Sequence, residues 1–220
     1  MTLELPVEVR DFLTKAEIFR QPQLRINPLS PEAALDYSAC LRTQVLGTDL
    51  GFIALDDADD SNPYCYMETG VARGMIVHLR HDGEPRVAFQ NLNSLHNAFA
   101  RLTELGLDID ELAAETKLLH ADQEALAEAF SQYCVQDDDE AVFCICLLLP
   151  LLSSNEFKTL ETLANSNSLF IREAVAEHLS CNPSPHARAL AQHLANDSSA
   201  QVRSAAKEAL RAIRDQSAAN

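Results

Sequence analysis

Glycine and the basic residues are scarce in this chain of 220 residues, and tryptophan does not occur. With 6 glycines, the chain has few turns that can hold a phosphate group closely. It also contains no GxSxG, P-loop, HExxH or glycine-rich dinucleotide motif. The sequence signatures of nucleotide-binding enzymes, serine hydrolases and zinc proteases are therefore missing.

Lysine and arginine number 17 against 33 aspartates and glutamates, which gives a formal net charge of −16 and a pI near 4.7. A charge of this sign repels phosphate backbones and anionic membrane surfaces. We therefore expect neither a nucleic-acid partner nor a membrane partner, and a basic protein is the better partner. The excess is concentrated in residues 104–155, which contain twelve acidic side chains and one basic one.

Long apolar runs and paired cysteines are absent as well. The longest apolar run, AVFCICLLLPLL at 141–152, is shorter than the roughly 20 residues that a helix needs to cross a bilayer. The amino terminus has no basic start followed by an apolar stretch, unlike a secretory signal. The six cysteines form no CxxC pair. These features predict a protein of the reducing cytoplasm.

The first half of the chain carries both helix and strand patterns. Apolar residues at helical spacing predict helices at 6–19, 31–45 and 94–105, the last with Ser94 as its cap. Short β-branched and aromatic runs predict strands at 51–55, 64–67, 74–81 and 86–89. Their connections are too short for parallel crossovers, so we expect an antiparallel meander. Alternation places Ile76, His78 and Arg80 on one face of the third strand, which we expect to be partly wet.

The second half contains an internal repeat. LANSNSLFIREAVAEHL at 163–179 matches LANDSSAQVRSAAKEAL at 194–210 with eight identities in 17 positions. The helix end, polar turn and R-x-A of each copy resemble the helix pairs of HEAT-type repeats. Such units bury their apolar faces only by stacking, and the expected helices of 121–152 would supply the neighbour. We therefore predict an α+β fold with a meander domain at 1–103 and an all-helical, HEAT-like domain at 104–220.

Two acidic runs, DDADDS at 56–61 and DDDE at 137–140, are the candidate sites. Counted from Asp57 to Glu68, the first has the ligand spacing of a calcium-binding EF-hand loop. Asn62 stands where that loop needs glycine, Pro63 follows, and the flanks are strands, so calcium is not favoured. Adjacent aspartates in a polar loop are normally solvated and ionised, which does not favour acid/base chemistry. A solvated turn and a surface for a protein partner remain.

Histidines and cysteines show no ligand spacing. His78 and His81 lie three apart on a strand, so alternation sends them to opposite faces, and we expect edge or surface positions. Cys144 and Cys146 do not face each other on a helix and are expected to fill the core. We predict no metal and no cofactor.

The segment GFIALDDADDSNPYCYMETGVARGMIVHLRHDGEPRVAFQNLNSLHNAF resembles the SMI1/KNR4 (SUKH) family. The shared features are an apolar strand, an acidic turn, Asn-Pro before a second strand, a glycine-led strand ending in His-Asp, a short strand, and a Ser-Leu and Phe motif that enters a helix, here Ser94-Leu95 through Phe99. The resemblance implies an α+β domain without catalytic activity. Many bacterial members are immunity proteins that neutralise a cognate toxin, often a nuclease, and other members are regulatory scaffolds.

Our interpretation is a cytoplasmic immunity protein, not an enzyme, that covers the basic cleft of a nuclease delivered between bacterial cells, as by type VI secretion. Carboxylates would replace phosphates against the toxin's lysines and arginines, with tyrosines as anchors. The predicted contact residues are Asp56, Asp57, Asp59, Asp60, Tyr64, Tyr66, Asp137, Asp138, Asp139 and Glu140. The alternative is a non-catalytic scaffold or regulatory module, and an enzyme is the third reading. The sequence leaves open the oligomeric state and which acidic run makes the contact.

Overall fold

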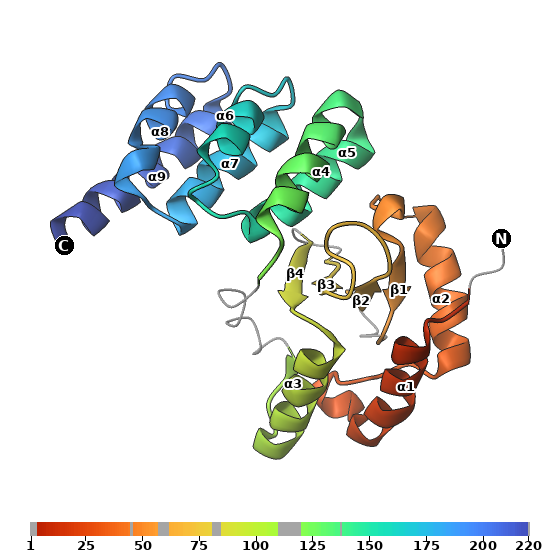
Figure 1. The fold of residues 1–220 in the computed structure, drawn as a ribbon. Helices are drawn as coiled ribbons and strands as arrows, with labels where there is room; N and C mark the ends of the chain where they lie inside the picture. The colour runs from red at the N-terminus through yellow and green to blue at the C-terminus, as the bar shows by residue number, and fades with distance from the viewer. Residues whose placement is uncertain are drawn as a thin grey trace. The chain divides into compact units, whose positions relative to one another are not determined.

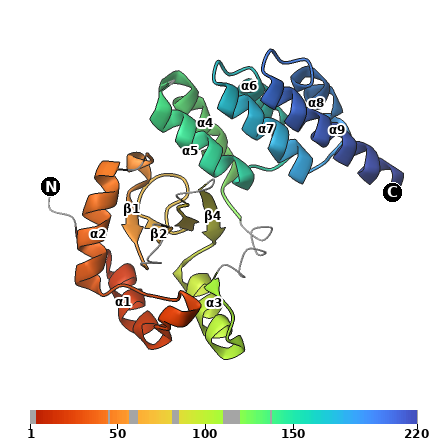
Figure 2. The same ribbon diagram turned by 180° about the vertical axis from the view of Figure 1, so that it is seen from behind.

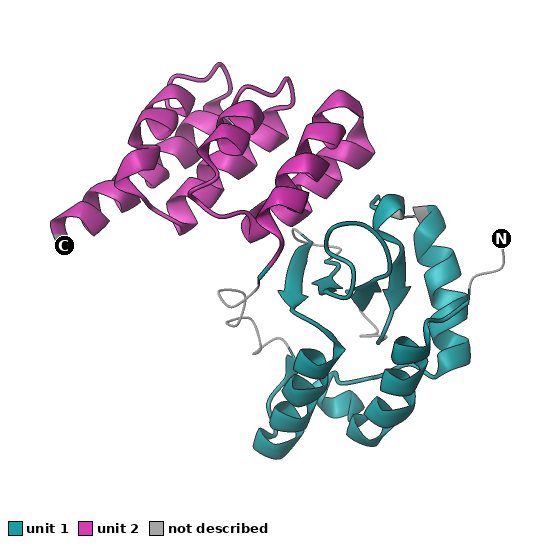
Figure 3. Cartoon of the chain, viewed as in Figure 1, with its two compact units in different colours: residues 1–120 teal, residues 121–220 magenta. Residues whose placement is uncertain are grey.

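The computed structural model describes residues 4–44, 46–56, 62–80, 85–109, 120–136 and 138–219. The fold is α+β, as the sequence predicts: a four-stranded antiparallel sheet with flanking helices is followed by an all-helical part (Figure 1). The chain divides into two compact units, residues 1–120 and residues 121–220 (Figure 3). The boundary that we placed near residue 103 falls inside a helix of unit 1, and the division lies at 120 instead.

Unit 1 has the helices α1 (Val7–Ala16), α2 (Pro31–Gln44) and α3 (Leu92–Leu105), with 3-10 turns η1 (Glu17–Phe19), η2 (Pro22–Leu24) and η3 (Thr48–Leu50). α1 buries Val9, Phe12, Leu13 and Ala16, the spacing of one helix face. α3 begins one turn before the expected cap. The side chain of Asn91, not of Ser94, caps this helix by accepting a hydrogen bond from the Ser94 N–H at 3.0 Å.

The sheet has the order β1 (Phe52–Ala54), β2 (Tyr64–Met67), β3 (Ile76–His78) and β4 (Arg86–Phe89), and each strand is antiparallel to the next. One face joins the core cluster with α1 and α3, and it contains Tyr64, Tyr66 and Ile76. His78 lies opposite Tyr64 in the register. The face of β3 that we expected to be wet is therefore the core face, and only Arg80, beyond the strand, is exposed.

Unit 2 contains three consecutive helix pairs. Their helices are α4 (Gln123–Gln136), α5 (Asp139–Leu148), α6 (Phe157–Ala164), α7 (Leu169–Cys181), α8 (Arg188–Leu194) and α9 (Ala200–Ala219), with 3-10 turns η6 (Leu149–Leu151) and η7 (Pro185–Ala187). α7 contacts both α5 and α9, and α6 contacts both α4 and α8. The turns within the three pairs lie along one edge (Figures 1 and 2). The pair α4–α5 thus continues the stack that the repeat predicts.

The stack buries small and branched apolar side chains along its inner helices. Ile171, Val175 and Leu179 of α7 and Val202 and Ala206 of α9 are fully or almost fully buried. Among the residues that the structure describes, no helix is both long enough and apolar enough to cross a membrane.

Candidate functional site

Asp56, a predicted contact residue, lies in the interior of unit 1. Its side chain is fully buried, and Oδ1 accepts a hydrogen bond from the Tyr64 N–H at 2.6 Å. The carboxylate therefore joins the end of β1 to the start of β2 and cannot reach a partner. The prediction of a contact role for Asp56 is wrong, because the strand hairpin uses this carboxylate as an internal acceptor. Asp57, Asp59 and Asp60 lie outside the described residues.

The two predicted tyrosine anchors are also in the core. Tyr64 is 2% exposed and its ring stacks on that of His78 at a centroid distance of 4.3 Å. Tyr66 is 4% exposed, and its hydroxyl donates to Glu8 Oε1 at 3.1 Å. Residues two apart on a strand share a face, and here that face is the core face. The anchor role of Tyr64 and Tyr66 and the surface position of His78 are thus wrong, and His81 lies outside the described residues.

A cleft of about 400 Å³ adjoins the Tyr66 hydroxyl. Glu8 and Asp11 of α1 line it one helical turn apart, together with Asn93 and His96 of α3. Burial, then the neighbouring Glu8, raises the pKa of Tyr66, so the phenol stays protonated and keeps donating to the carboxylate. Sequence reasoning missed this cleft, although the spacing of Glu8 and Asp11 places both on one helix face. Its groups can exchange hydrogen bonds with a polar side chain of a partner.

The second acidic run lies at the exposed start of α5. The Asp138 side chain caps this helix by accepting a hydrogen bond from the Ala141 N–H at 2.8 Å. Asp138 and Asp139 are exposed and Glu140 is half-buried, while Asp137 lies outside the described residues. Carboxylates are stabilised at this end of a helix by the helix dipole. The cap holds the Asp138 carboxylate in place, and the Asp139 side chain beside it is exposed.

The net negative charge of unit 2 lies in and around its first helix pair. Residues 121–156 contain eight acidic side chains and no lysine or arginine, whereas residues 157–220 contain six acidic and seven basic ones. Asp122, Glu124 and Glu128 of the first pair are exposed. The charge therefore changes along the stack, from strongly acidic at α4–α5 to near neutral beyond it.

An exposed aromatic residue, Phe170, lies on α7, the helix after α6. It is 60% exposed and is the second residue of α7, the position that Glu140 has in the neighbouring α5. The helices α5 and α7 contact each other, and an exposed large aromatic side chain and a charged rim are common parts of a protein-binding surface. The sequence repeat could have identified Phe170 as a surface residue, because the matching position in the second copy is the polar Gln201. We call Asp138, Asp139, Glu140 and Phe170 the acidic edge.

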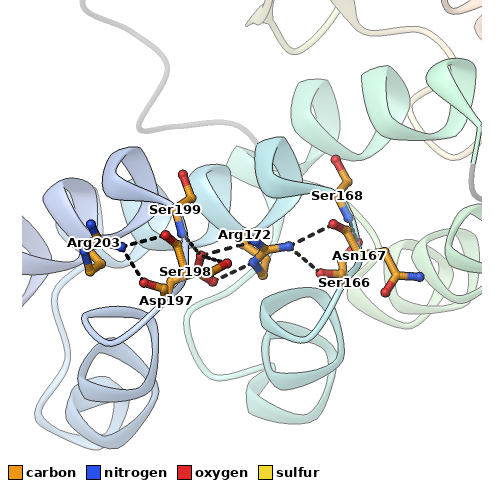
Figure 4. Close-up of polar contacts among 8 residues, drawn as sticks. All are labelled: Ser166, Asn167, Ser168, Arg172, Asp197, Ser198, Ser199 and Arg203. Atoms are coloured by element: carbon orange, nitrogen blue, oxygen red, sulfur yellow. Dashed lines mark hydrogen bonds and ion pairs between the residues drawn. The ribbon is translucent and has the colours of Figure 1, made fainter.

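An arginine network holds the turns of the last two pairs together (Figure 4). Arg172 of α7 pairs with Asp197 in the α8–α9 turn, with Nε to Oδ2 at 2.7 Å and Nη2 to Oδ1 at 3.2 Å. The guanidinium lowers the pKa of Asp197, and the Ser199 N–H adds to this effect. Arg172 and Arg203 are identical positions of the sequence repeat, so the repeat carries a contact between turns as well as a packing pattern.

Metal ligands do not gather in the part of the chain that the structure describes, where no group of three or more His, Cys, Asp or Glu side chains could hold an ion. Glu68, the last position of the EF-hand spacing, pairs with Arg42 of α2 at 2.8 Å instead. All six cysteines are free thiols. Cys144 is buried and Cys146 half-buried in α5.

A scan against protein-family models gave no match, and searches of curated proteins and of solved structures found no similar protein. The resemblance to the SMI1/KNR4 family therefore rests on the motifs of this chain alone.

Proposed function

We propose that this chain is a non-catalytic immunity protein that binds a cognate bacterial toxin, a basic nuclease acting in the cytoplasm, and covers its active-site cleft. The observation that carries the proposal is the acidic edge. Its residues Asp138, Asp139 and Phe170 are exposed, and residues 121–156 hold eight carboxylates and no lysine or arginine. Such a surface matches a cleft built to bind phosphates.

The mechanism is occlusion by charge mimicry. A nuclease cleft presents lysine and arginine to the phosphates of its substrate, and Asp138, Asp139 and Glu140 can take the places of those phosphates. Phe170 supplies the apolar contact that exposed ion pairs lack, since each such pair contributes only about 0–1 kcal/mol. The uncompensated charge of α4–α5 also accelerates encounter with a basic partner at low salt.

Burial removes Asp56, Tyr64 and Tyr66 from the proposed contact, which then rests on unit 2. Asp57, Asp59 and Asp60 lie outside the described residues and stay predicted contacts. The SMI1/KNR4 resemblance of unit 1 supports the class of function, immunity without catalysis. Among the described residues of unit 1, Glu8 and Asp11 in the cleft beside Tyr66 can add a polar contact.

Affinity capture from the native host tests the proposal with three baits. The first is the wild-type chain, and the second is an edge variant with Asp139→Lys, Glu140→Lys and Phe170→Ala. The third is a control with Glu208→Lys and Asp215→Lys, two exposed carboxylates of α9. We expect the first and third baits to retain one basic nuclease and the edge variant to lose it. Equal capture by all three would remove the acidic edge from the interface.

The alternative is a scaffold or regulatory module that holds a peptide on its helical repeats. A groove of about 420 Å³ between α6 and α8 favours it, with Phe157 and Leu190 as apolar lining and Glu161, His186 and His193 as polar lining. The same capture separates the two functions. Several housekeeping proteins, retained equally by the edge variant, would favour the scaffold.

A further inference from the structure

The contact between Arg172 and Asp197 shows how one turn of the stack binds the next. Arg172 Nη1 donates to the carbonyl oxygens of Ser166 and Asn167 in its own turn, at 2.8 and 2.9 Å. Its other edge, Nε and Nη2, binds both carboxylate oxygens of Asp197 in the following turn. The two side chains are 14% and 11% exposed, so the pair is largely withdrawn from water. The carboxylate-binding edge of this arginine therefore points along the stack.

Arg203 repeats the first half of this arrangement one unit further on. Its Nη1 donates to the carbonyl oxygens of Asp197 and Ser198, both at 2.7 Å (Figure 4). The edge formed by its Nε and Nη2 makes no hydrogen bond to any residue within the described ranges. The local bonds orient Arg203 as they orient Arg172, so the corresponding edge of its guanidinium lies on the face of α9.

The surrounding face of α9 is basic where the matching face of α7 is apolar and covered. Ala176 of α7 is fully buried, and its counterpart in the repeat is the exposed Lys207. Leu179 is fully buried, and its counterpart Leu210 is half-buried. Arg214 falls on the same side of the helix as Arg203 and Lys207. We call Arg203, Lys207, Leu210 and Arg214 the basic face.

We propose that the basic face binds the acidic edge of a second copy of this chain, with a carboxylate of its α4–α5 turn at Arg203. Arg172 shows that a guanidinium of this orientation binds an aspartate next to the start of a neighbouring helix, and Asp138 and Asp139 are aspartates at the start of α5. Both are exposed, on a helix pair without a basic residue. The pair α6–α7 separates the two surfaces within one chain, so the contact joins two copies.

This contact is heterologous, since different surfaces meet, and copies therefore add head to tail instead of closing a symmetric dimer. The contact does not depend on the proposed toxin. It does occupy the same acidic edge, so a bound basic partner and a second copy exclude each other. Exposed ion pairs are weak and are screened by salt, and Arg214 also pairs with the adjacent Asp215 at 3.2 Å. The association is therefore weak and favoured by low ionic strength.

Analytical ultracentrifugation of the full chain tests the proposal. In about 20 mM salt we expect the weight-average mass to rise as protein concentration increases from about 0.01 to 1 mM. In about 500 mM salt the chain returns to the mass of one copy, because the pairs are screened. Lys207→Glu and Asp139→Lys each abolish the rise, and Arg188→Glu, an exposed basic residue of α8, leaves it unchanged.

A charge exchange makes the test specific. Mixing Lys207→Glu with Asp139→Lys, or combining both in one chain, pairs each altered surface with an opposite charge and restores the rise in mass. Circular dichroism checks that each variant is folded. The proposal is overturned if the wild-type chain stays a single copy over this range, if Arg188→Glu acts as strongly as Lys207→Glu, or if neither the mixture nor the combined variant recovers association.

Discussion

Arg172 links two turns of unit 2. A single guanidinium fixes its own turn through two carbonyl oxygens and the next turn through both oxygens of Asp197. Charge-assisted bidentate hydrogen bonds of this kind are stronger than neutral ones, and partial burial reduces their screening by salt. The Arg211–Glu208 pair on α9 has the same N–O distance, 2.7 Å, but both side chains are more than half exposed.

Replacing Arg172 with methionine removes these bonds and leaves the Asp197 carboxylate without its cation. We expect the free energy of unfolding of unit 2 to fall by about 2–4 kcal/mol, as when one partner of a buried ion pair is removed. Arg211→Ala is the control and should change it by less than about 1 kcal/mol. Urea unfolding followed by circular dichroism measures both, and similar losses in the two variants would contradict the special role of Arg172.

His178 of α7 is a buried group whose protonation opposes folding. Burial lowers its pKa from 6.5 to about 4. Between these values the unfolded chain binds the proton and the folded chain does not, so stability is fully present above pH 6.5 and is lost as the pH falls toward 4. The loss is on the order of 3 kcal/mol.

The pH dependence of urea unfolding measures this effect. Compared with His178→Gln, the wild-type chain should lose its stability advantage steadily between pH 6.5 and 4.5. The lowered pKa of Asp197 acts in a separate window, because its contribution is lost only as the pH falls below the ordinary carboxyl value of 3.8. If the unfolding free energies of wild type and His178→Gln run parallel between pH 6.5 and 4.5, His178 is not the titrating group.

At the scale of elements, the start of α3 lies one turn before the position that the local sequence pattern predicts. Both Asn91 and Ser94 are good capping residues, and only the backbone path decides which of them precedes the helix. Asn91 has the extended backbone of a cap, with φ −168 and ψ 177 degrees. Ser94 lies within the first turn and supplies the N–H that Asn91 accepts.

Asn91→Ala should therefore destabilise unit 1 by about 1 kcal/mol, the usual cost of losing a side-chain cap. Ser94→Ala keeps the backbone N–H and should cost less than half as much. Thermal unfolding of the two variants compares them directly. A larger loss of stability for Ser94→Ala would indicate that Ser94 is the capping residue, as the sequence suggested.

The kinds and order of elements were predictable because each has a local cause. Alternating and helical periodicities, with Asn-Pro and glycine between them, mark strands and helices within a few residues. Which side chains of a strand face the core was not predictable in the same way. In YCYM and GMIVHL both faces are apolar enough to be buried, so nothing in the run itself shows that Tyr64, Tyr66 and His78 face the core.

At the scale of the whole chain, each unit has its own apolar core, and we expect a core substitution to act within its own unit. Asp56→Ala removes the buried acceptor of the Tyr64 N–H and should raise amide exchange in residues 52–89. Arg172→Met should raise it in residues 157–219. Hydrogen exchange read by mass spectrometry resolves the two regions, and equal changes in both units for either variant would show that they unfold together.

The sequence by itself determined the net charge, the antiparallel meander, the stacked helix pairs and the acidic start of α5, because composition, periodicity and capping are local properties. Only the tertiary structure decided that Asp56 is an internal acceptor, that Phe170 is exposed at the start of α7, and that Arg172 binds a carboxylate 25 residues further along the chain. The physical reason is that burial and pairing depend on what packs against a side chain. Those neighbours come from elements distant in sequence, which no local pattern specifies.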